Sequence, residues 1–301
     1  MPNKVADCLG FIAWDEDGVS ENRGVKISML EKLPSNRAQE ISAAIRELHF
    51  VSSGEDLYYC YNANMQELIA SVFEFAKSYL ELGHMEDDIL SAASFNFSRL
   101  TLNLLGMFKS FLDHGHAALV RRFGEQSEEV TSWKAAQSEQ YDQSMAYRFF
   151  YNLRNYAQHV GMPPLHFSLN HDAEKEGVEV VLEFHRSELL ASYNRWSKDA
   201  KADLIGGEEH IHMLPLLDDW SHCFHRLVTH IQSVRRGACL ASANMIVALR
   251  SEFKIPGEGT IVLMPEPVLN DGGQLNFGYR KIPEKKAIEI VDDTFLKGLE
   301  A

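Results

Sequence analysis

Apolar side chains recur at helical spacing along three consecutive segments, and this periodicity constrains the fold more than any other feature. Residues 66–83 carry an apolar side chain every three or four positions until Gly83 ends the pattern, as in an amphipathic helix. Residues 86–123 continue the same rhythm. Because that segment is long for a single helix, we expect a kink near Gly106 or a break at Gly115.

A third helix is predicted over residues 128–160, since Gly161 and the two prolines that follow it closely would stop it. Helical patterning returns over residues 188–204 and 215–253. Consecutive helices joined by short connections pack as an up-and-down bundle. The sequence therefore predicts a mainly α fold.

Short segments rich in β-favouring residues predict small β additions at the N-terminus, after the third helix and at the C-terminus. The middle one is a hairpin near residues 165–184. The segments are 9–14, 57–61, 165–169, 178–184, 260–264 and 275–279. We therefore divide the chain into an N-terminal α/β extension (1–64), a helical bundle (65–254) and a C-terminal β-containing extension (255–301).

The chain of 301 residues is 45% hydrophobic and has a formal net charge of -14. Phosphate binding needs clustered Lys and Arg, so this charge excludes a protein whose whole surface binds nucleic acid. The four cysteines form no C-x-x-C pair, which argues against a zinc knuckle and favours a reducing cytoplasm. No segment stays apolar for about 18 residues and no signal peptide is recognisable, so we expect a cytoplasmic protein without membrane contact.

The third predicted helix has an unusual polar face. At about 100° per residue, its apolar side chains gather on one side: Phe149, Leu153, Tyr156 and Val160. The opposite side carries Tyr151, Arg154, Asn155 and Gln158, with His159 at its edge. Neither Glu nor Lys occurs in this stretch, although a solvated helix face normally carries both. Such a face suits contact with another chain or with a substrate.

Arg154 and His159 are the residue types that RNA cleavage by the 2'-hydroxyl requires. A base must take the proton of that hydroxyl, an acid must protonate the leaving 5'-oxygen, and a cation must stabilise the phosphorane. Imidazole serves as base or acid near neutral pH, and a guanidinium matches phosphate oxygens with paired donors. Five helical residues span about 140° around the axis, so we expect two copies of the helix end to line one composite cleft.

The pair Arg154-Asn155, followed by His159 near a helix end, resembles the signature of the HEPN superfamily. The resemblance implies a helical bundle, dimerisation through the motif helix and metal-independent endoribonuclease activity, as in bacterial toxins, phage-defence and CRISPR-associated proteins. It also implies that Arg154 and His159 are the catalytic pair and that Asn155 is their polar neighbour. Members paired with a nucleotidyltransferase antitoxin commonly carry a Tyr two residues after the His. This chain has Gly161 there, so regulation by AMP transfer onto that position is not supported.

Further polar residues are candidates to support the pair. Tyr151 and Gln158 share its helix face. In the second helix, Asn103 and His114 fall near one stripe that could hydrogen-bond the motif helix. Asp113 is the best candidate carboxylate for fixing a histidine tautomer. The alternative is an ordinary polar seam at a helix end.

Several histidines in the second half of the chain raise the question of a metal site: His210, His212, His222, His225 and His230. The spacing of His222 and His225 can place two imidazoles on one helix face. No closed ligand set with a familiar spacing is present in the sequence, so we expect neither a metal nor a cofactor.

We therefore predict a metal-independent endoribonuclease that acts through Arg154 and His159 at a homodimer interface, as a toxin or phage-defence effector. Its partners would be an RNA substrate such as tRNA or mRNA, a second copy of the chain, and an antitoxin or defence-system protein. The alternative is a non-catalytic dimer of the same helical type that serves as a protein-binding or regulatory module. The acidic charge favours the alternative, whereas the amide-rich face of the motif helix favours the enzyme.

Overall fold

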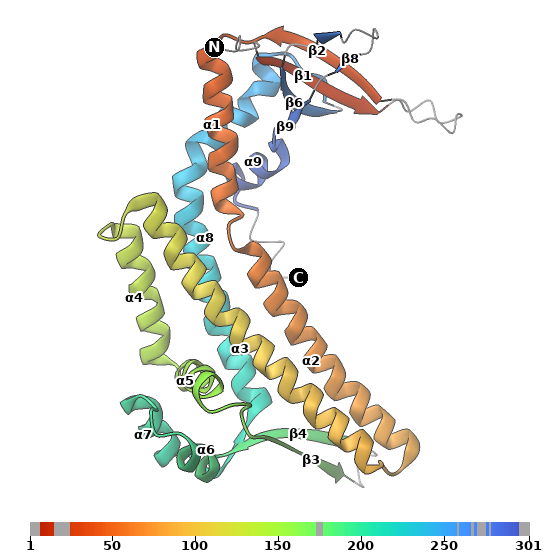
Figure 1. Cartoon of the computed structure of the whole chain (residues 1–301), viewed down its shortest axis with the longest axis vertical. Coiled ribbons are helices and arrows are strands. Elements are labelled where there is room, and N and C mark those ends of the chain that lie inside the picture. The colour runs from red at the N-terminus through yellow and green to blue at the C-terminus, as the bar shows by residue number, and fades with distance from the viewer. Residues whose placement is uncertain are drawn as a thin grey trace. The chain divides into compact units, whose positions relative to one another are not determined.

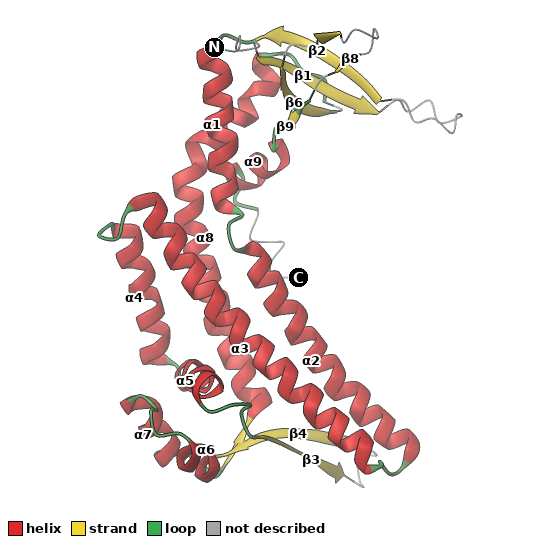
Figure 2. Ribbon diagram, viewed as in Figure 1, coloured by secondary structure: helices red, strands yellow, loops and turns green. Residues whose placement is uncertain are grey.

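The structure is a computed structural model that describes residues 7–14, 25–172, 177–257, 259–265, 268–269, 275–276 and 278–294. The chain forms two compact units, one comprising Met1–Ser52 and Gln232–Ala301 and the other comprising Ser53–Ile231. Helix α8 (Met213–Glu252) runs through both, so each unit contains a part of it. The expected mainly α fold with small β additions is confirmed (Figure 2).

In the first unit, strands from both ends of the chain form one antiparallel sheet (Figure 1). Their order across the sheet is β2 (Val25–Lys32), β1 (Asp7–Trp14), β6 (Thr260–Pro265) and β9 (Arg280–Lys281). A two-stranded ribbon pairs β7 (Val268–Leu269) with β8 (Leu275–Asn276). The strands expected at 9–14 and 260–264 are confirmed, and β8 covers residues 275–276 of the third.

Helices α1 (Ser35–Val51) and α9 (Glu284–Val291) share a core with the sheet and with the part of α8 beyond Ile231. The core residues include Leu9, Ile41, Ile45, Leu48, Ile246, Leu249, Ile261, Leu263 and Ile290. The two terminal segments that the sequence suggested as separate additions therefore belong to one hydrophobic core. That association rests on pairing between β1 and β6, which lie far apart in the sequence.

The second unit begins with a helical hairpin in which α2 (Glu55–Leu82) and α3 (Asp87–Phe123) lie side by side (Figure 1). Helix α2 ends as expected at Gly83, whose φ of 72° places it in the left-handed region that glycine tolerates. Helix α3 runs without a break, so the break expected at Gly115 is wrong. Gly115 is instead a packing residue, because a Cβ there would lie 2.6 Å from Cδ1 of Ile231.

The prediction of a strand at residues 57–61 is also wrong, since this segment forms the first turns of α2. Tyr58 and Tyr61 stand almost one helical turn apart and are both buried. Their rings pack against Phe224 with centroid distances of 5.7 and 4.4 Å. Helical packing against α8 therefore outweighs the β preference of tyrosine.

The single helix predicted over residues 128–160 divides into α4 (Glu128–Gln143) and α5 (Met145–His159). Ser144 lies between them in an extended conformation, and its side chain accepts a hydrogen bond from the backbone N–H of Tyr147. A serine in this position caps the second helix. Figure 1 shows α5 nearly end-on while α4 lies lengthwise, so the chain turns sharply at the cap.

Aromatic side chains fix α5 within the unit. The ring of Phe150 stacks on Trp220 of α8 at a centroid distance of 4.5 Å. Phe108 of α3 contacts the same indole at 4.9 Å. All three side chains are almost fully buried. Helices α3 and α8 thus cover one side of the motif helix α5, and its polar face lies on the opposite side.

A three-stranded antiparallel sheet follows α5. It consists of β3 (Leu165–Asp172), β4 (Gly177–His185) and β5 (His210–His212). The first two strands confirm the expected hairpin, and β5 is an addition that the sequence did not indicate. Between β4 and β5, the helical segment expected at 188–204 divides into α6 (Arg186–Ser192) and α7 (Lys198–Gly206). The irregular link between these two helices lies beside the end of α5, as described below. Among the described residues, no helix has an apolar stretch that could cross a membrane.

Candidate functional site

Helix α5 buries the face that the sequence predicts. Phe149, Leu153 and Tyr156 are at most 4% exposed. Val160, expected on the same side, is 46% exposed because the helix ends at His159 and the chain turns away from the core. Tyr151 is half-buried and stacks on Tyr147 at 6.3 Å. Tyr151 therefore belongs to an aromatic cluster as well as to the polar face.

Arg154 interacts only with neutral amide oxygens. Its Nη1 donates to Oε1 of Gln158 and, at 3.4 Å, to Oδ1 of Asn155. In the described part of the chain it has no carboxylate partner. Arg148 of the same helix differs, because its Nε donates to Asp203 at 2.6 Å and this bond raises the pKa of the guanidinium. The charge of Arg154 is thus positioned but not neutralised.

His159 is exposed and lines a surface hollow of about 350 Å³. The other lining residues are Val160, Ala191, Ser192, Tyr193, Asn194 and Arg195. Arg195 is exposed and makes no ion pair or hydrogen bond with any described residue. The fold therefore places a second guanidinium without a carboxylate partner beside the histidine of the motif.

The link that carries Arg195 is attached to α5 by part-buried hydrogen bonds. Asn152, 3% exposed, accepts from the backbone N–H of Ser197 at 3.0 Å and donates to its Oγ at 3.2 Å. Tyr156 donates its phenolic proton to Oγ of Ser192 at 2.9 Å. These bonds hold both ends of the link against the motif helix. No sequence pattern singles out Arg195, because its position beside His159 depends on this attachment.

The expected supporting residues of α3 have other partners. Asn103 donates to Asn64 of α2 at 3.1 Å. Asp113 forms an ion pair with Lys109, one turn earlier on the same helix. His114 is exposed. None of the three has a hydrogen bond or ion pair with Arg154 or His159. The polar stripe of α3 thus faces α2 and solvent, which agrees with the polar-seam alternative.

The histidines of α8 do not gather into one site. His222 faces Asp218 of its own helix at 3.7 Å. His225 lies 3.4 Å from the hydroxyl of Tyr58. His230 bonds Ser132 at 3.0 Å. Each has a different neighbour, so the structure does not bring these three histidines together as one ligand set. His210 belongs instead to a group of histidines and glutamates on the β3–β5 sheet.

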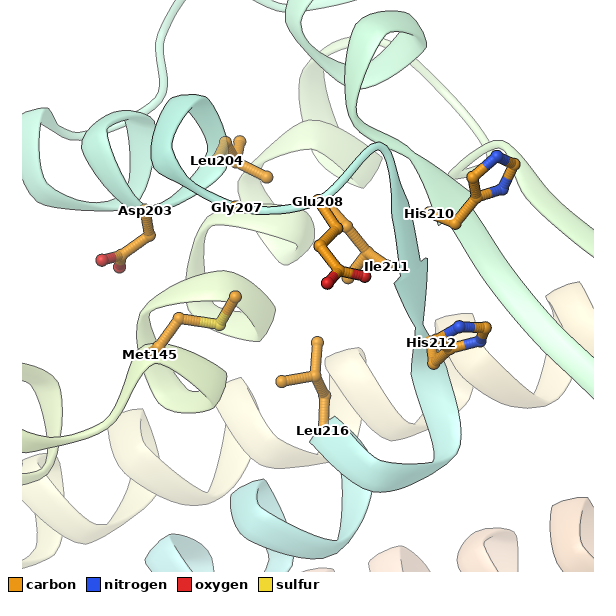
Figure 3. A pocket seen from close by; sticks show the side chains of 9 residues that line it. All are labelled: Met145, Asp203, Leu204, Gly207, Glu208, His210, Ile211, His212 and Leu216. Carbon is orange, nitrogen blue, oxygen red and sulfur yellow. The ribbon is translucent and has the colours of Figure 1, made fainter.

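A smaller pocket of about 200 Å³ lies where α5 begins, α7 ends and β5 passes (Figure 3). Met145, Leu204, Ile211 and Leu216 give it an apolar lining. The lining also contains two carboxylates, and one of them, Asp203, is engaged with Arg148. This combination does not suit a phosphate group.

A comparison with known protein families, with curated proteins and with solved structures finds no match to this chain. The functional conclusion therefore depends on the chemistry of its own residues.

Proposed function

We propose that this protein is a metal-independent endoribonuclease of the HEPN type, with His159, Arg154 and Arg195 at its active site. One observation carries the proposal. Two guanidinium groups that have no carboxylate partner among the described residues accompany the motif histidine, in a chain whose net charge is -14. In such an acidic chain, we expect most Arg and Lys side chains to pair with carboxylates, as Arg148 does. A local excess of positive charge favours a phosphate ligand.

The reaction needs no group beyond these side chains and the RNA. The 2'-oxygen attacks phosphorus, the bond from phosphorus to the 5'-oxygen breaks, and the products are a 2',3'-cyclic phosphate and a 5'-hydroxyl. The proton lost by the 2'-hydroxyl passes to a base, and an acid gives a proton to the leaving oxygen. The imidazole of His159 can take the first proton as the base, and the imidazolium that results can give a proton to the leaving oxygen as the acid, while the guanidinium groups stabilise the charge on the phosphorane.

A second copy of the chain would complete this site. Arg154 does not line the hollow beside His159, so within one chain the two motif residues do not share it. Val160 and Met162, immediately after the motif, are each 46% exposed. Apolar side chains in such a position favour coverage by another protein surface. A homodimer formed through this helix end would bury them and bring the Arg154 of one copy toward the His159 of the other.

Purified protein incubated with total RNA and with tRNA in the presence of EDTA tests the proposal. We expect wild-type protein to release fragments with cyclic phosphate ends. His159→Ala should cut at least about a hundredfold more slowly, since general acid–base catalysis contributes that much or more. His222→Ala is the matched control, because His222 is also an exposed histidine on a helix. If wild type and His159→Ala released the same fragments in the same amounts, the endoribonuclease proposal would be contradicted.

The strongly acidic charge favours one alternative, a non-catalytic dimer that binds another protein, such as an antitoxin or a defence-system component. In that case the residues at the end of α5 form contacts with the partner. RNA would then remain intact with every variant, and His159→Ala would instead weaken capture of the partner.

A further inference from the structure

The three-stranded sheet of the second unit has two chemically different faces. One face is apolar and packs into the unit through Phe167, Leu182, Phe184 and Ile211. Because side chains alternate along a strand, the residues between them point the other way. This second face carries His166, Glu183, His185, His210 and His212, which lie opposite one another in the strand register. Figure 3 shows His210 and His212 on the side of β5 away from Ile211.

Two groups of three residues that include histidines of this face bring their ligand atoms within 4.8 Å of one another, and one group also contains Glu188 of α6. One is His166, His185 and Glu188, and the other is Glu183, His185 and His210. Both groups contain His185, so an ion bound by His185 could occupy only one of the two groups. The orientation of the rings decides which group is suitable.

The rings of His166 and His185 are stacked, with centroids 4.1 Å apart and planes 7° apart. The nitrogen lone pairs of stacked rings lie in parallel planes and do not converge on one point. The rings of His185 and His210 are 77° apart, with centroids at 4.9 Å. Their nitrogens can therefore point at a common centre. This difference favours the group that contains His210.

Glu183 connects the two converging rings. Its Oε1 lies 3.2 Å from Nε2 of His185 and 3.0 Å from Nδ1 of His210. Zinc bonds of about 2.0–2.1 Å in a tetrahedral site place ligand atoms roughly 3.3 Å apart. The observed separations are close to that spacing. A metal ion could thus replace the hydrogen atoms that these groups now share, without a large movement of the sheet.

The carboxylate of Glu183 is ready to bind a cation. Its side chain is only 15% exposed. Burial by itself would raise the pKa of Glu183, but hydrogen bonds from His210 and His185, together with their charges, hold that pKa below its ordinary value. Its place between the two imidazoles, and not this shift, is what favours a shared ion.

We propose that Glu183, His185 and His210 bind one divalent transition-metal ion of the zinc type, with a water molecule in the remaining position. Two imidazoles and a carboxylate are ligands that suit zinc better than calcium or magnesium. His166 stacks on His185 and bonds Glu188 at 2.7 Å, so it is a positioning residue for the His185 ring. The ion takes no part in RNA cleavage, because none of its three ligands lines the hollow beside His159.

Titration of the full chain, without a polyhistidine tag, after treatment with EDTA and removal of the chelator, tests this proposal. We expect calorimetry to show one Zn²⁺ bound per chain. Co²⁺ should give the strong visible absorption of a four-coordinate site. Glu183→Gln and His210→Ala should each weaken binding by at least about tenfold, while His166→Ala weakens it less. His222→Ala, which alters a histidine paired with a carboxylate outside the sheet, should bind as wild type does.

Three results would overturn the proposal. The first is no saturable binding of Zn²⁺ by wild type. The second is unchanged Zn²⁺ binding by the Glu183→Gln variant. Glutamine has nearly the same volume as glutamate, and circular dichroism of the variant verifies that it is folded. The third is loss of binding in His166→Ala with full binding in His210→Ala, which would place the ion at the other group. Each readout is metal binding, so failure here is distinct from failure of the ribonuclease proposal.

Discussion

The end of α5 and the polar face of the β3–β5 sheet both present exposed histidines, but the neighbours of those histidines differ in charge. His159 lies beside Arg195, one turn after Arg154, and neither guanidinium has a carboxylate partner in the described chain. The sheet histidines lie beside Glu183 and Glu188. On this basis we propose an anionic ligand for the histidine of the first region and a cationic ligand for the histidines of the second. The predictions below test this difference, from the largest expected effect to the smallest.

Removal of either guanidinium should produce the largest change. Arg154→Ala and Arg195→Ala should each slow RNA cleavage by about 10²–10³-fold, the usual effect of losing one group that stabilises charge in the transition state. Arg154→Lys should recover only part of the rate, since lysine keeps the charge and loses the paired donors. Initial rates on one defined RNA measure the effect. Arg121→Ala, at the exposed end of α3, serves as the control, and an equal loss there would show that only general charge matters.

A mixture of two inactive variants should restore some activity if the site is composite. His159→Ala and Arg154→Ala, mixed in equal amounts after unfolding and refolding, give heterodimers that contain one complete pair of motif residues. We expect up to about a quarter of the wild-type rate, because half of the dimers form one intact site of two. No recovery, in protein shown by light scattering to be dimeric, would place both residues in a site within one chain.

Asn152→Ala should loosen the link that carries Arg195. Asn152 is buried and holds Ser197 through two hydrogen bonds, so its loss should lower the free energy of unfolding by about 1–3 kcal/mol. Chemical denaturation measures the loss. Asn244→Ala is the matched control, because Asn244 is exposed and bonds only a carbonyl of its own helix. A stability loss that is the same for both variants would contradict the anchoring role of Asn152.

The acid limb of the stability profile should show the smallest effect. The pKa of Glu183 is lowered from its ordinary value of 4.5. Its contribution is therefore fully present above the unfolded pKa and is lost as the pH falls through the lower folded value. In metal-free protein, wild type should exceed Glu183→Gln by less than about 1 kcal/mol near neutrality. This gap should close as the pH falls below the ordinary carboxyl value of 4.5 and through the lowered folded pKa. Melting temperatures of both proteins across this range give the comparison. If the difference in melting temperature widened on acidification, the pKa of Glu183 would be raised by folding, which would contradict the account.

The sequence predicted the parts of the fold that depend on local pattern. Helix α3, the hairpin of β3 and β4 and the end of α2 at Gly83 all follow from periodicity or from a turn residue. The strand expected at residues 57–61 was wrong because a distant partner, Phe224, packs against Tyr58 and Tyr61 on one face of a helix. The cap at Ser144 was missed because a serine inside a polar run gives a weak signal.

The same limit applies to the sites. Arg154 and His159 could be selected from the sequence because they share one helix end. Arg195 could not, since only the hydrogen bonds of Asn152 and Tyr156 bring its link to that place. The ligand group of Glu183, His185 and His210 depends on the register between β4 and β5. The sequence shows His210 and His212 only as part of a loose group with the histidines of α8, from which we expected no metal site. The α8 side chains have separate neighbours.

The central claim is that the two histidine-bearing regions have different and separable chemistry. One crossed experiment tests it most directly: His159→Ala and His210→Ala are each assayed for RNA cleavage in EDTA and for Zn²⁺ binding. We predict that His159→Ala loses cleavage and binds Zn²⁺ as wild type does, while His210→Ala cuts RNA and binds Zn²⁺ at least about tenfold more weakly. A wild-type protein that leaves RNA intact, or a single variant that abolishes both properties while remaining folded, would contradict the claim.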